Sequence, residues 1–376
     1  MDNNEANFEN PAQKISTNNK TAKTLIFRFG AIIFLIFALI FLLIVGYVVK
    51  GFFDLDGSVA QEQRVVAQKN EIISPTPFPF QEMTIPYLRD REYSSNLGDL
   101  EMLSSSNSYT SYLTSYDSDG LRVNGLLTLP SGEMPSGGWP AIVFVHGYIP
   151  PKSYETTSNY SDYVDYLSRN GFVVFKIDLR GHGQSEGEAG GGYYSADYII
   201  DTLNARAALA ASDFVSAKRI GLWGHSMAGN VLLRSMAAQT DIPAIVIWAG
   251  AVYTYSDMQE YGIDDNSYRP PPQESARQRR REELFEKHGR FDPQSEFWSQ
   301  VAATNYLGDI EGAIQLNHAV DDGVVSVGYS RNLAELLSES GVEYELHEYS
   351  SGGHNINGAS FNSAMENTVE FFHENL

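Results

Sequence analysis

A serine near the middle of the chain stands in a pattern that is typical of a nucleophile. Residues 220–229 read Ile-Gly-Leu-Trp-Gly-His-Ser-Met-Ala-Gly, which predicts a short buried strand, a tight turn and a helix from about Ala228. A serine at such a turn is forced out of the sheet with its hydroxyl exposed. Gly224 stands two residues before Ser226, but Ala228 occupies the usual glycine position two residues after it, followed by Gly229. The alternative interpretation of Ser226 is an ordinary helix-capping serine.

Two later segments supply the groups that a serine nucleophile needs. A serine hydroxyl becomes nucleophilic when an imidazole accepts its proton, and a carboxylate must hold that imidazole in the correct tautomer. His354 lies in a glycine-flanked loop behind the last predicted strand, and Asp321 and Asp322 follow the strand predicted at 313–316. Nucleophile, acid and histidine therefore occur in the chain order of a known catalytic arrangement. We predict Ser226 as nucleophile and His354 as base, with either aspartate as the acid.

The same chemistry needs two N–H donors for the oxyanion. One should come from the residue after the nucleophile, Met227, and the other from the loop after the strand predicted at 141–145. In that loop we expect the Tyr148 N–H to be the second donor, with Gly147 allowing the backbone to approach the substrate. Three further histidines beside these motifs are interpreted as structural: His146, His182 and His225.

Alternating strands and helices must position these residues. Continuous apolar strands between amphipathic helices predict a mainly parallel sheet that is covered on both faces. A hairpin over 109–115 and 121–129 comes first. Strands are then expected at 141–145, 172–177, 220–223, 244–248, 313–316 and 344–349, and helices at 160–170, 195–212, 228–239, 325–340 and 363–374.

An insertion over 251–311 interrupts this alternation and is too long for a plain connection. It contains Tyr253, Tyr255, Tyr261 and Tyr268, a run of three prolines and an arginine-rich helix predicted over 274–288. One interpretation is a cap over the active site, whose arginines Arg277 and Arg280 could bind a substrate carboxylate. The favoured alternative is a solvated helix whose arginines pair with glutamates at helical spacing.

Composition excludes several classes of function. The 376 residues carry a net charge of −21, which argues against nucleic-acid binding because no basic surface offsets phosphate repulsion. The sequence holds no cysteine, so disulfides, thiolate catalysis and cysteine zinc sites are excluded. No metal-ligand spacing such as His-Glu-x-x-His occurs, and we expect neither a metal nor another cofactor.

The first eighty residues predict a membrane anchor and a spacer. Residues 1–24 are polar and are predicted to be a disordered tail. Residues 25–49 are predicted to be a transmembrane signal anchor, because 31–49 form an uncharged run of 19 residues. Alternate prolines in 50–80 indicate an extended stalk, and the catalytic domain is expected over 81–376.

The charges that flank the anchor predict its orientation. Lysines and an arginine precede the span, whereas Lys50 is followed by two aspartates. The positive-inside rule then leaves the N-terminus in the cytoplasm. We expect a single-pass protein of the cell membrane that contacts the lipid bilayer through residues 25–49 and holds its catalytic domain outside the cytoplasm.

From about Tyr109 to the C-terminus, the chain resembles the catalytic domain of the prolyl oligopeptidase family of serine peptidases, within the α/β-hydrolase superfamily. The resemblance implies an α/β-hydrolase fold, and it favours Asp322 as the acid because Asp-x-x-Val-Ser resembles the Asp-x-x-Val-Pro turn of that fold. The stretches that carry it are Ser118-Asp119-Gly120-Leu121, Leu126-Leu127-Thr128-Leu129-Pro130, Phe144-Val145-His146-Gly147-Tyr148, Asp178-Leu179-Arg180-Gly181-His182-Gly183, Gly224-His225-Ser226-Met227-Ala228-Gly229, Asp322 and Gly353-His354.

The resemblance implies a serine peptidase that forms an acyl-enzyme on a small peptide. The β-propeller of that family has no counterpart in the sequence, and relatives without a propeller include esterases. The alternative is therefore a carboxylesterase that acts on acyl or carbohydrate esters. A catalytically inactive binding module is a less favoured alternative, because the complete set of predicted catalytic residues opposes it.

Overall fold

The computed structural model describes residues 79–269 and 275–376, all within one compact unit of the chain. The predicted tail and membrane anchor lie outside these residues, as do nearly all of the stalk and the three-proline run. None of the helices within the described ranges combines the length and the apolar character that a membrane span requires.

A nine-stranded sheet forms the centre of this unit, in the order β1-β2-β3-β5-β4-β6-β7-β8-β9. Strands β1 to β3 pair antiparallel, β3 pairs antiparallel with β5, and all pairs from β5 to β9 are parallel. The predicted mainly parallel sheet is confirmed. The bounds are β1 Glu101–Ser105, β2 Tyr109–Ser118, β3 Leu121–Pro130, β4 Trp139–Val145, β5 Val173–Ile177, β6 Val215–His225, β7 Ala244–Trp248, β8 Ala313–Ala319 and β9 Tyr344–Tyr349.

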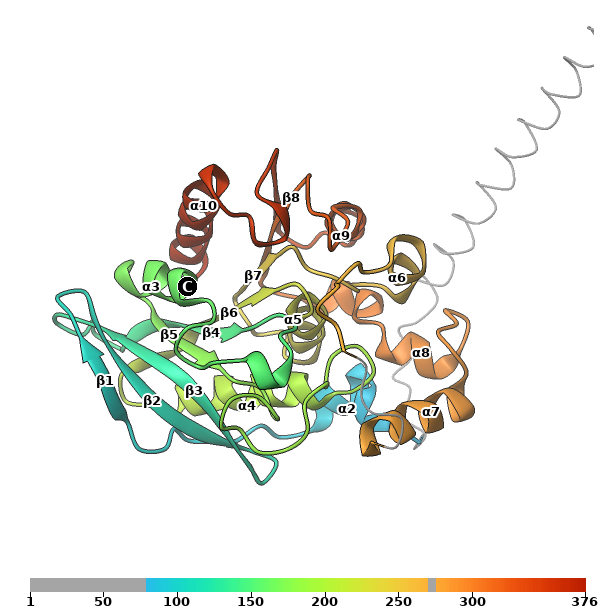
Figure 1. Ribbon diagram of the computed structural model, residues 1–376, viewed down its shortest axis with the longest axis horizontal. Coiled ribbons are helices and arrows are strands. Elements are labelled where there is room, and N and C mark those ends of the chain that lie inside the picture. Colours follow the sequence, from blue (N-terminus) through green and yellow to red (C-terminus); the bar gives the residue numbers. More distant parts are fainter. Residues whose placement is uncertain (1–78, 270–274) are drawn as a thin grey trace, which may run out of the picture. The chain divides into compact units, whose positions relative to one another are not determined.

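Helices cover both faces of the sheet, as Figure 1 shows. Helices α3 and α10 pack with one apolar cluster, and α2, α4, α5, α8 and α9 pack with the other. The whole of α5, which follows the predicted nucleophile, is buried. The bounds are α2 Ile85–Asp90, α3 Ser161–Arg169, α4 Asp197–Ala210, α5 Ala228–Ala238, α6 Tyr255–Tyr261, α7 Ala276–His288, α8 Glu296–Val301, α9 Gly328–Ser340 and α10 Ala359–Asn375, with 3-10 helices at Gln81–Met83, Pro151–Ser153, Ala303–Asp309 and Gly353–Asn355.

Apart from the 3-10 helices, four short elements were not predicted: β1, α2, α6 and α8. Every residue of β1 is exposed, so the strand has no buried face to give an alternating pattern. Helices α2 and α8 have only six residues each, too few for a clear helical period. Each begins at a side-chain cap, Thr84 for α2 and Ser295 for α8.

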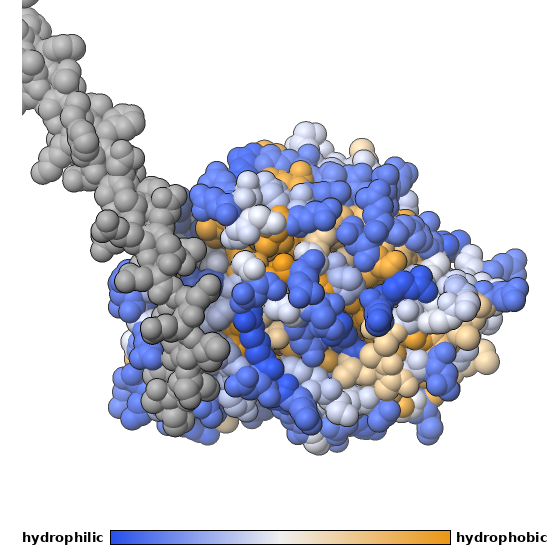
Figure 2. Space-filling view, turned by 180° about the vertical axis from the view of Figure 1, so that it is seen from behind, coloured by the Kyte–Doolittle hydropathy of each residue, from blue (hydrophilic) through white to orange (hydrophobic). Residues whose placement is uncertain are grey.

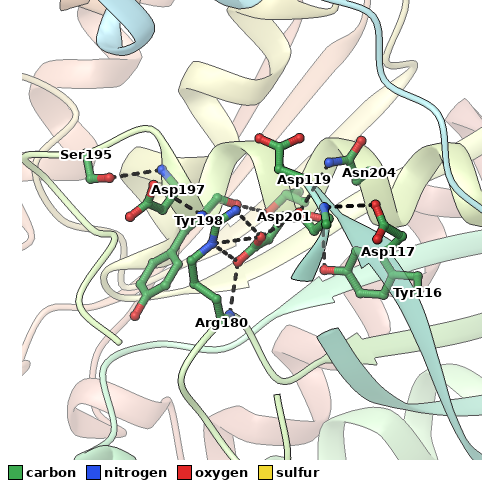
Figure 3. Close-up of polar contacts among 12 residues, drawn as sticks. Tyr116, Asp117, Asp119, Arg180, Ser195, Asp197, Tyr198, Asp201 and Asn204 are labelled. Carbon is green, nitrogen blue, oxygen red and sulfur yellow. Dashed lines mark hydrogen bonds and ion pairs between the residues drawn. The ribbon is translucent and has the colours of Figure 1, made fainter. Parts of the chain in front are cut away.

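A buried ion pair fixes the loop that follows β5. The guanidinium of Arg180 lies 2.7 Å from the carboxylate of Asp201 on α4, whose side chain is fully buried. The Ser118 hydroxyl donates to the same carboxylate at 2.7 Å, and the Tyr116 hydroxyl donates to the Asp201 carbonyl at 2.9 Å (Figure 3). The hairpin of β2 and β3, helix α4 and the loop after β5 are therefore held together at one point.

On the face shown in Figure 2, most of the visible side chains are hydrophilic, and hydrophobic ones lie between them. Among the described residues, the large hydrophobic side chains that are exposed lie mainly at or beside loops and at β1. They are Leu100, Met102, Leu103, Met134, Tyr268 and Val320.

Candidate active site

The predicted catalytic residues meet at one edge of the sheet. Ser226 follows β6, Asp322 lies three residues after β8, and His354 lies in the loop after β9. Since these strands are parallel, their carboxyl ends share one edge, where ligands bind in open α/β sheets. The structure therefore brings together residues that are far apart in the sequence.

The three side chains form a continuous hydrogen-bonded chain. The Ser226 hydroxyl lies 2.9 Å from His354 Nε2, and His354 Nδ1 lies 2.8 Å from Asp322 Oδ2. Since a carboxylate accepts hydrogen bonds only, Nδ1 carries the hydrogen and Nε2 faces the serine as an acceptor. This tautomer is the one in which the imidazole can take the serine proton.

The backbone at Ser226 has the strained conformation that was expected of the turn. Its φ is 57°, in the left-handed region that a residue with a side chain adopts at an energetic cost. The strain is held by hydrogen bonds: the Ser226 N–H donates to the Trp248 carbonyl at 2.9 Å, and the Ser226 carbonyl accepts from Gly229 N at 2.9 Å and Ala251 N at 3.1 Å.

The alanine at position 228 fits the turn because Gly224 faces it. A Cβ added to Gly224 would lie 2.8 Å from the Ala228 Cβ, so a methyl group is tolerated on one side only. A Cβ added to Gly229 would lie 2.9 Å from the Gly250 Cα and 3.2 Å from Ala251 N. The close approach of backbones thus falls at Gly229, one residue later than the usual pattern.

The carboxylate of Asp322 is completely buried and heavily hydrogen bonded. Its Oδ1 accepts from Val324 N at 2.8 Å and from Val325 N at 3.0 Å. Burial by itself raises the pKa of Asp322, but hydrogen bonds from His318 and His354 outweigh burial and hold the pKa below its usual range. Asp322 is therefore an anion at neutral pH, as an orienting acid must be.

The neighbouring aspartate binds backbone instead of an imidazole. Asp321 accepts hydrogen bonds from Gly353 N at 2.8 Å and from Gly352 N at 3.3 Å. Both glycines have positive φ in the turn that leads to His354. Asp321 therefore caps the loop that carries His354.

The proposed oxyanion donors lie on two different elements. Met227 directly precedes α5, and Tyr148 follows β4 by three residues. Within the described part of the chain, neither the Met227 N–H nor the Tyr148 N–H donates to another backbone or side-chain group. Within the described residues, both N–H groups thus lack a protein acceptor, as the predicted role requires.

The three histidines interpreted as structural are all buried. His146 packs its ring on Tyr154 and His182, with ring centroids 4.4 Å and 4.8 Å away. Burial lowers the pKa of His146 and of His182, so both are neutral at physiological pH. His225 packs its ring 4.6 Å from that of His354.

Sequence reasoning assigned no role to two side chains that contact this site. His318, at the end of β8, lies 3.3 Å from the Asp322 carboxylate. A histidine that ends a strand just before the acid is a signal that could have identified it. Tyr160 hydrogen bonds to Gly147 N and His225 from the start of α3. No sequence pattern points to that contact.

Part of the insertion lies beside the predicted oxyanion loop. The Tyr268 ring packs 5.4 Å from the Tyr148 ring, and Arg269 N donates to the Tyr148 hydroxyl at 3.0 Å. The Asp264 N–H donates to the Val324 carbonyl at 2.9 Å, in the loop of the acid. Residues 264–269 thus connect two loops of the site.

The arginines of α7 make contacts that neither sequence interpretation expected. Arg277 donates to the carbonyls of Gly190 and Glu188 and lies 3.6 Å from the Asp197 carboxylate. Arg280 pairs with Glu82. Arg277 and Arg280 therefore fasten α7 to other elements, and the hypothesis that they line a substrate pocket loses its basis.

Comparisons with known proteins agree with this fold. Residues 140–278 match the model of a family described as serine aminopeptidase, S33. The chain is similar to the protein named probable dipeptidyl-aminopeptidase B from Fusarium vanettenii, with 26% identity over 244 residues, which are 63% of this chain. Those residues are 24% of the relative, so the chain spans about a quarter of its length.

Solved structures of a peptidase and an esterase are similar in fold. The acylaminoacyl peptidase of Pyrococcus horikoshii has a TM-score of 0.55 and 20% identity, over 73% of this chain and 44% of its own. Acetyl xylan esterase 1 of Thermoanaerobacterium sp. has a TM-score of 0.53 and 18% identity, over 80% of this chain and 94% of its own.

These observations agree on one fold. The sheet order, the strained serine turn and the comparisons all point to the same architecture. The described part of this chain has an α/β-hydrolase fold, and residues 140–278 match the family model described as serine aminopeptidase, S33.

Proposed function

We propose that this chain is a membrane-anchored serine peptidase that uses Ser226, His354 and Asp322 and forms an acyl-enzyme. The observation that carries the proposal is the pair of hydrogen bonds that joins the three side chains. Ser226 Oγ lies 2.9 Å from His354 Nε2, and His354 Nδ1 lies 2.8 Å from Asp322 Oδ2. A serine, an imidazole and a buried carboxylate in this order generate a nucleophile at neutral pH.

The first half of the reaction forms the acyl-enzyme. His354 Nε2 accepts the hydroxyl proton as Ser226 Oγ bonds to the carbonyl carbon of the substrate, whose oxygen takes the displaced electron pair. The N–H groups of Met227 and Tyr148 donate to that oxyanion. The C–N bond then breaks, and the leaving amine takes the proton from His354. Asp322 stabilises the imidazolium in between.

The second half repeats these steps with water. His354 accepts a proton from a water molecule as its oxygen attacks the acyl carbon. The ester bond to Ser226 then breaks, and His354 returns the proton to Oγ. The carboxylic acid leaves, and the enzyme is restored with atoms and charge in balance. An ester substrate would follow the same course with an alcohol as leaving group.

A peptide substrate is favoured over an ester by the matching family and by the curated relative, both of which carry the name of an aminopeptidase. The specific observation in favour of the esterase alternative is the acetyl xylan esterase structure, because the likeness extends over 94% of that protein's chain.

Matched amide and ester substrates distinguish the two activities. The purified protein should be given 4-nitroanilide and 4-nitrophenyl ester substrates with identical acyl groups, alongside Ser226→Ala. Amides are harder to cleave than activated esters, so cleavage of the nitroanilide is the result that identifies a peptidase. The wild type should release nitroaniline, and Ser226→Ala should not. Cleavage of the esters without cleavage of any amide in the panel would show that the enzyme is a carboxylesterase and not a peptidase.

The membrane location rests on the sequence of residues 25–49 and on the charges that precede them. The proposed arrangement holds the catalytic domain outside the cytoplasm at the end of the stalk over 50–80. Protease added to intact cells should release a soluble, active domain by cutting in that stalk. Full protection of the domain in intact cells, with cleavage after lysis, would contradict the orientation.

A further inference from the structure

A chain of hydrogen bonds passes through His225, the residue before Ser226, and joins two loops of the site. The Gly147 N–H donates to the Tyr160 hydroxyl at 3.0 Å, and that hydroxyl lies 2.7 Å from His225 Nδ1. On the other side of the ring, His225 Nε2 lies 2.8 Å from the main-chain carbonyl of His354. The bonds thus lead from the loop after β4, through the last residue of β6, to the loop of the catalytic base.

The chemistry of the groups fixes the direction of every bond. A carbonyl oxygen only accepts, so His225 Nε2 carries the hydrogen that faces His354. In a neutral imidazole Nδ1 is then an acceptor, so the Tyr160 hydroxyl donates to it. The oxygen of Tyr160 is left to accept from Gly147 N. Burial, together with the nearby His354 ring, lowers the pKa of His225 to about 3, which keeps this ring neutral at physiological pH.

We propose that His225 and Tyr160 are positioning residues that hold the oxyanion loop and the base loop at fixed distances from Ser226. Gly147 directly precedes Tyr148, the proposed oxyanion donor, and His225 directly precedes the nucleophile. The third contact is made to the backbone of His354 itself. This inference rests on the proposed serine chemistry, because it concerns the alignment of those catalytic groups.

Tight packing around the bridge supports the assignment. A Cβ added to Gly147 would lie 2.9 Å from the Tyr160 hydroxyl and 3.0 Å from His225 Nδ1, so only glycine leaves room for the bridge. The Tyr160 ring packs edge-on against Phe144 and Trp223, with centroids 5.5 Å and 6.1 Å away. The packing of the Tyr160 ring therefore fixes the position of its hydroxyl.

The structure provides a matched control on the same helix. The Tyr163 hydroxyl donates to the Asn355 carbonyl at 2.8 Å, so it also binds the base loop. Among the described residues, the Tyr163 ring packs on Tyr160, Trp223, Trp248 and Phe361, none of which belongs to the oxyanion loop. Tyr163→Phe and Tyr160→Phe therefore remove the same chemical group, but only the second one cuts the bridge.

The experiment measures the second-order rate of fluorophosphonate labelling, which requires the catalytic serine and no knowledge of the substrate. Wild type should be compared with Tyr160→Phe, His225→Leu, the double variant and Tyr163→Phe. Each bridge variant should lose about 10- to 100-fold in rate, less than the roughly 10²- to 10³-fold lost when an oxyanion donor is removed, because the donors stay and only their positions are disturbed. The double variant should be little slower than the slower single variant, because the residues act through one chain.

Tyr163→Phe should cost less in rate and combine additively with His225→Leu, while its thermal midpoint stays close to that of Tyr160→Phe. His225→Gln, which keeps one donor and one acceptor, should recover part of the loss if His225→Leu folds poorly. Additive effects of Tyr160→Phe and His225→Leu, or an equal loss of labelling rate in Tyr163→Phe, would overturn the proposed bridge but not the proposed function. Absence of labelling in the folded wild type would overturn the proposed function and, with it, this inference.

Discussion

His318 Nε2 lies 3.3 Å from Asp322 Oδ2, the same carboxylate oxygen that lies 2.8 Å from His354 Nδ1. His318 is fully buried, and its ring is held on both sides, by the Val325 carbonyl at 3.0 Å and the Ser330 hydroxyl at 2.8 Å. The orienting acid of the site is thus placed between two imidazoles, of which only one reaches the serine.

Replacing this second imidazole should weaken catalysis without abolishing it. His318→Leu removes one of the groups that hold Asp322 Oδ2, while the bonds from Val324 N, Val325 N and His354 remain. The carboxylate should be less firmly oriented, and turnover should fall by about 10- to 100-fold, the range seen when the hydrogen-bond partners of metal ligands are removed. Ser330→Ala is the control, because it removes the support at Nδ1 and leaves the contact with Asp322 intact. An equal loss of turnover in both variants would show that only packing is involved.

The two neighbouring aspartates should differ strongly in their effect on turnover. Asp322→Asn disrupts the tautomer of His354 and should cost about 10⁴-fold in kcat. Asp321→Asn keeps an oxygen that can accept from the Gly353 N–H, so its loss should be several-fold at most. Steady-state kinetics on one substrate measures both. A larger defect at position 321 would transfer the role of the acid to Asp321.

The low pKa of Asp322 predicts how its contribution to stability depends on pH. A carboxyl whose pKa is lower in the folded state stabilises the fold above its unfolded pKa of about 4, and this stabilisation is lost as the pH falls through the folded value. The free energy of unfolding of wild type should therefore exceed that of Asp322→Asn most at about pH 6.5, and the difference should shrink towards about pH 3.

The comparison with a variant is needed because other buried carboxyls act in the opposite sense. Burial raises the pKa of Asp178 to about 6 and also raises that of Asp201. These two groups favour the folded state at lower pH. Urea titrations of both proteins at each pH isolate the contribution of Asp322. A difference that stays constant or grows on acidification would contradict the low pKa.

The serine turn should tolerate a methyl group at position 228 or at position 224, but not at both. Gly224→Ala would bring two Cβ atoms to 2.8 Å, so the turn must shift, and both labelling and thermal stability should decrease. Adding Ala228→Gly to this variant removes the contact between the two Cβ atoms and leaves close contacts of 2.9 and 3.0 Å only with the flexible end of Leu232, so much of both properties should be restored. Gly308→Ala, where a Cβ meets no heavy atom within 4 Å, is the control. If the second substitution does not restore activity, the new Cβ at position 224 must clash mainly with another group, for example with Leu232.

Much of this architecture was predictable because several buried strands are continuous apolar runs followed by a short loop. The apolar runs at 141–145 and 244–248 agree with β4 and β7 to within two residues at each end, and the segment predicted at 344–349 agrees with β9, although that strand is only partly buried. The predicted catalytic residues come from such loops, and parallel strands bring their loops to one edge. Local pattern and topology were therefore sufficient to place Ser226 and His354 together.

The finer contacts of the site could not be predicted, because they depend on tertiary packing. Nothing in the sequence around Tyr160 indicates that its hydroxyl meets both Gly147 and His225. The contacts of Arg277 with the carbonyls of Gly190 and Glu188 likewise depend on how two distant loops meet. Strand β1 was missed because, with both of its faces exposed, it buries no residues that could give a pattern.

The most direct test of the account is fluorophosphonate labelling of the purified protein followed by mass spectrometry of its peptides. In the reaction, Ser226 Oγ forms a bond to phosphorus, fluoride leaves and His354 takes the hydroxyl proton. We predict a single modified residue, Ser226, and no labelling of a Ser226→Ala variant whose thermal unfolding matches wild type. Labelling that persists in Ser226→Ala, or modification at another serine in wild type, would contradict Ser226 as the nucleophile.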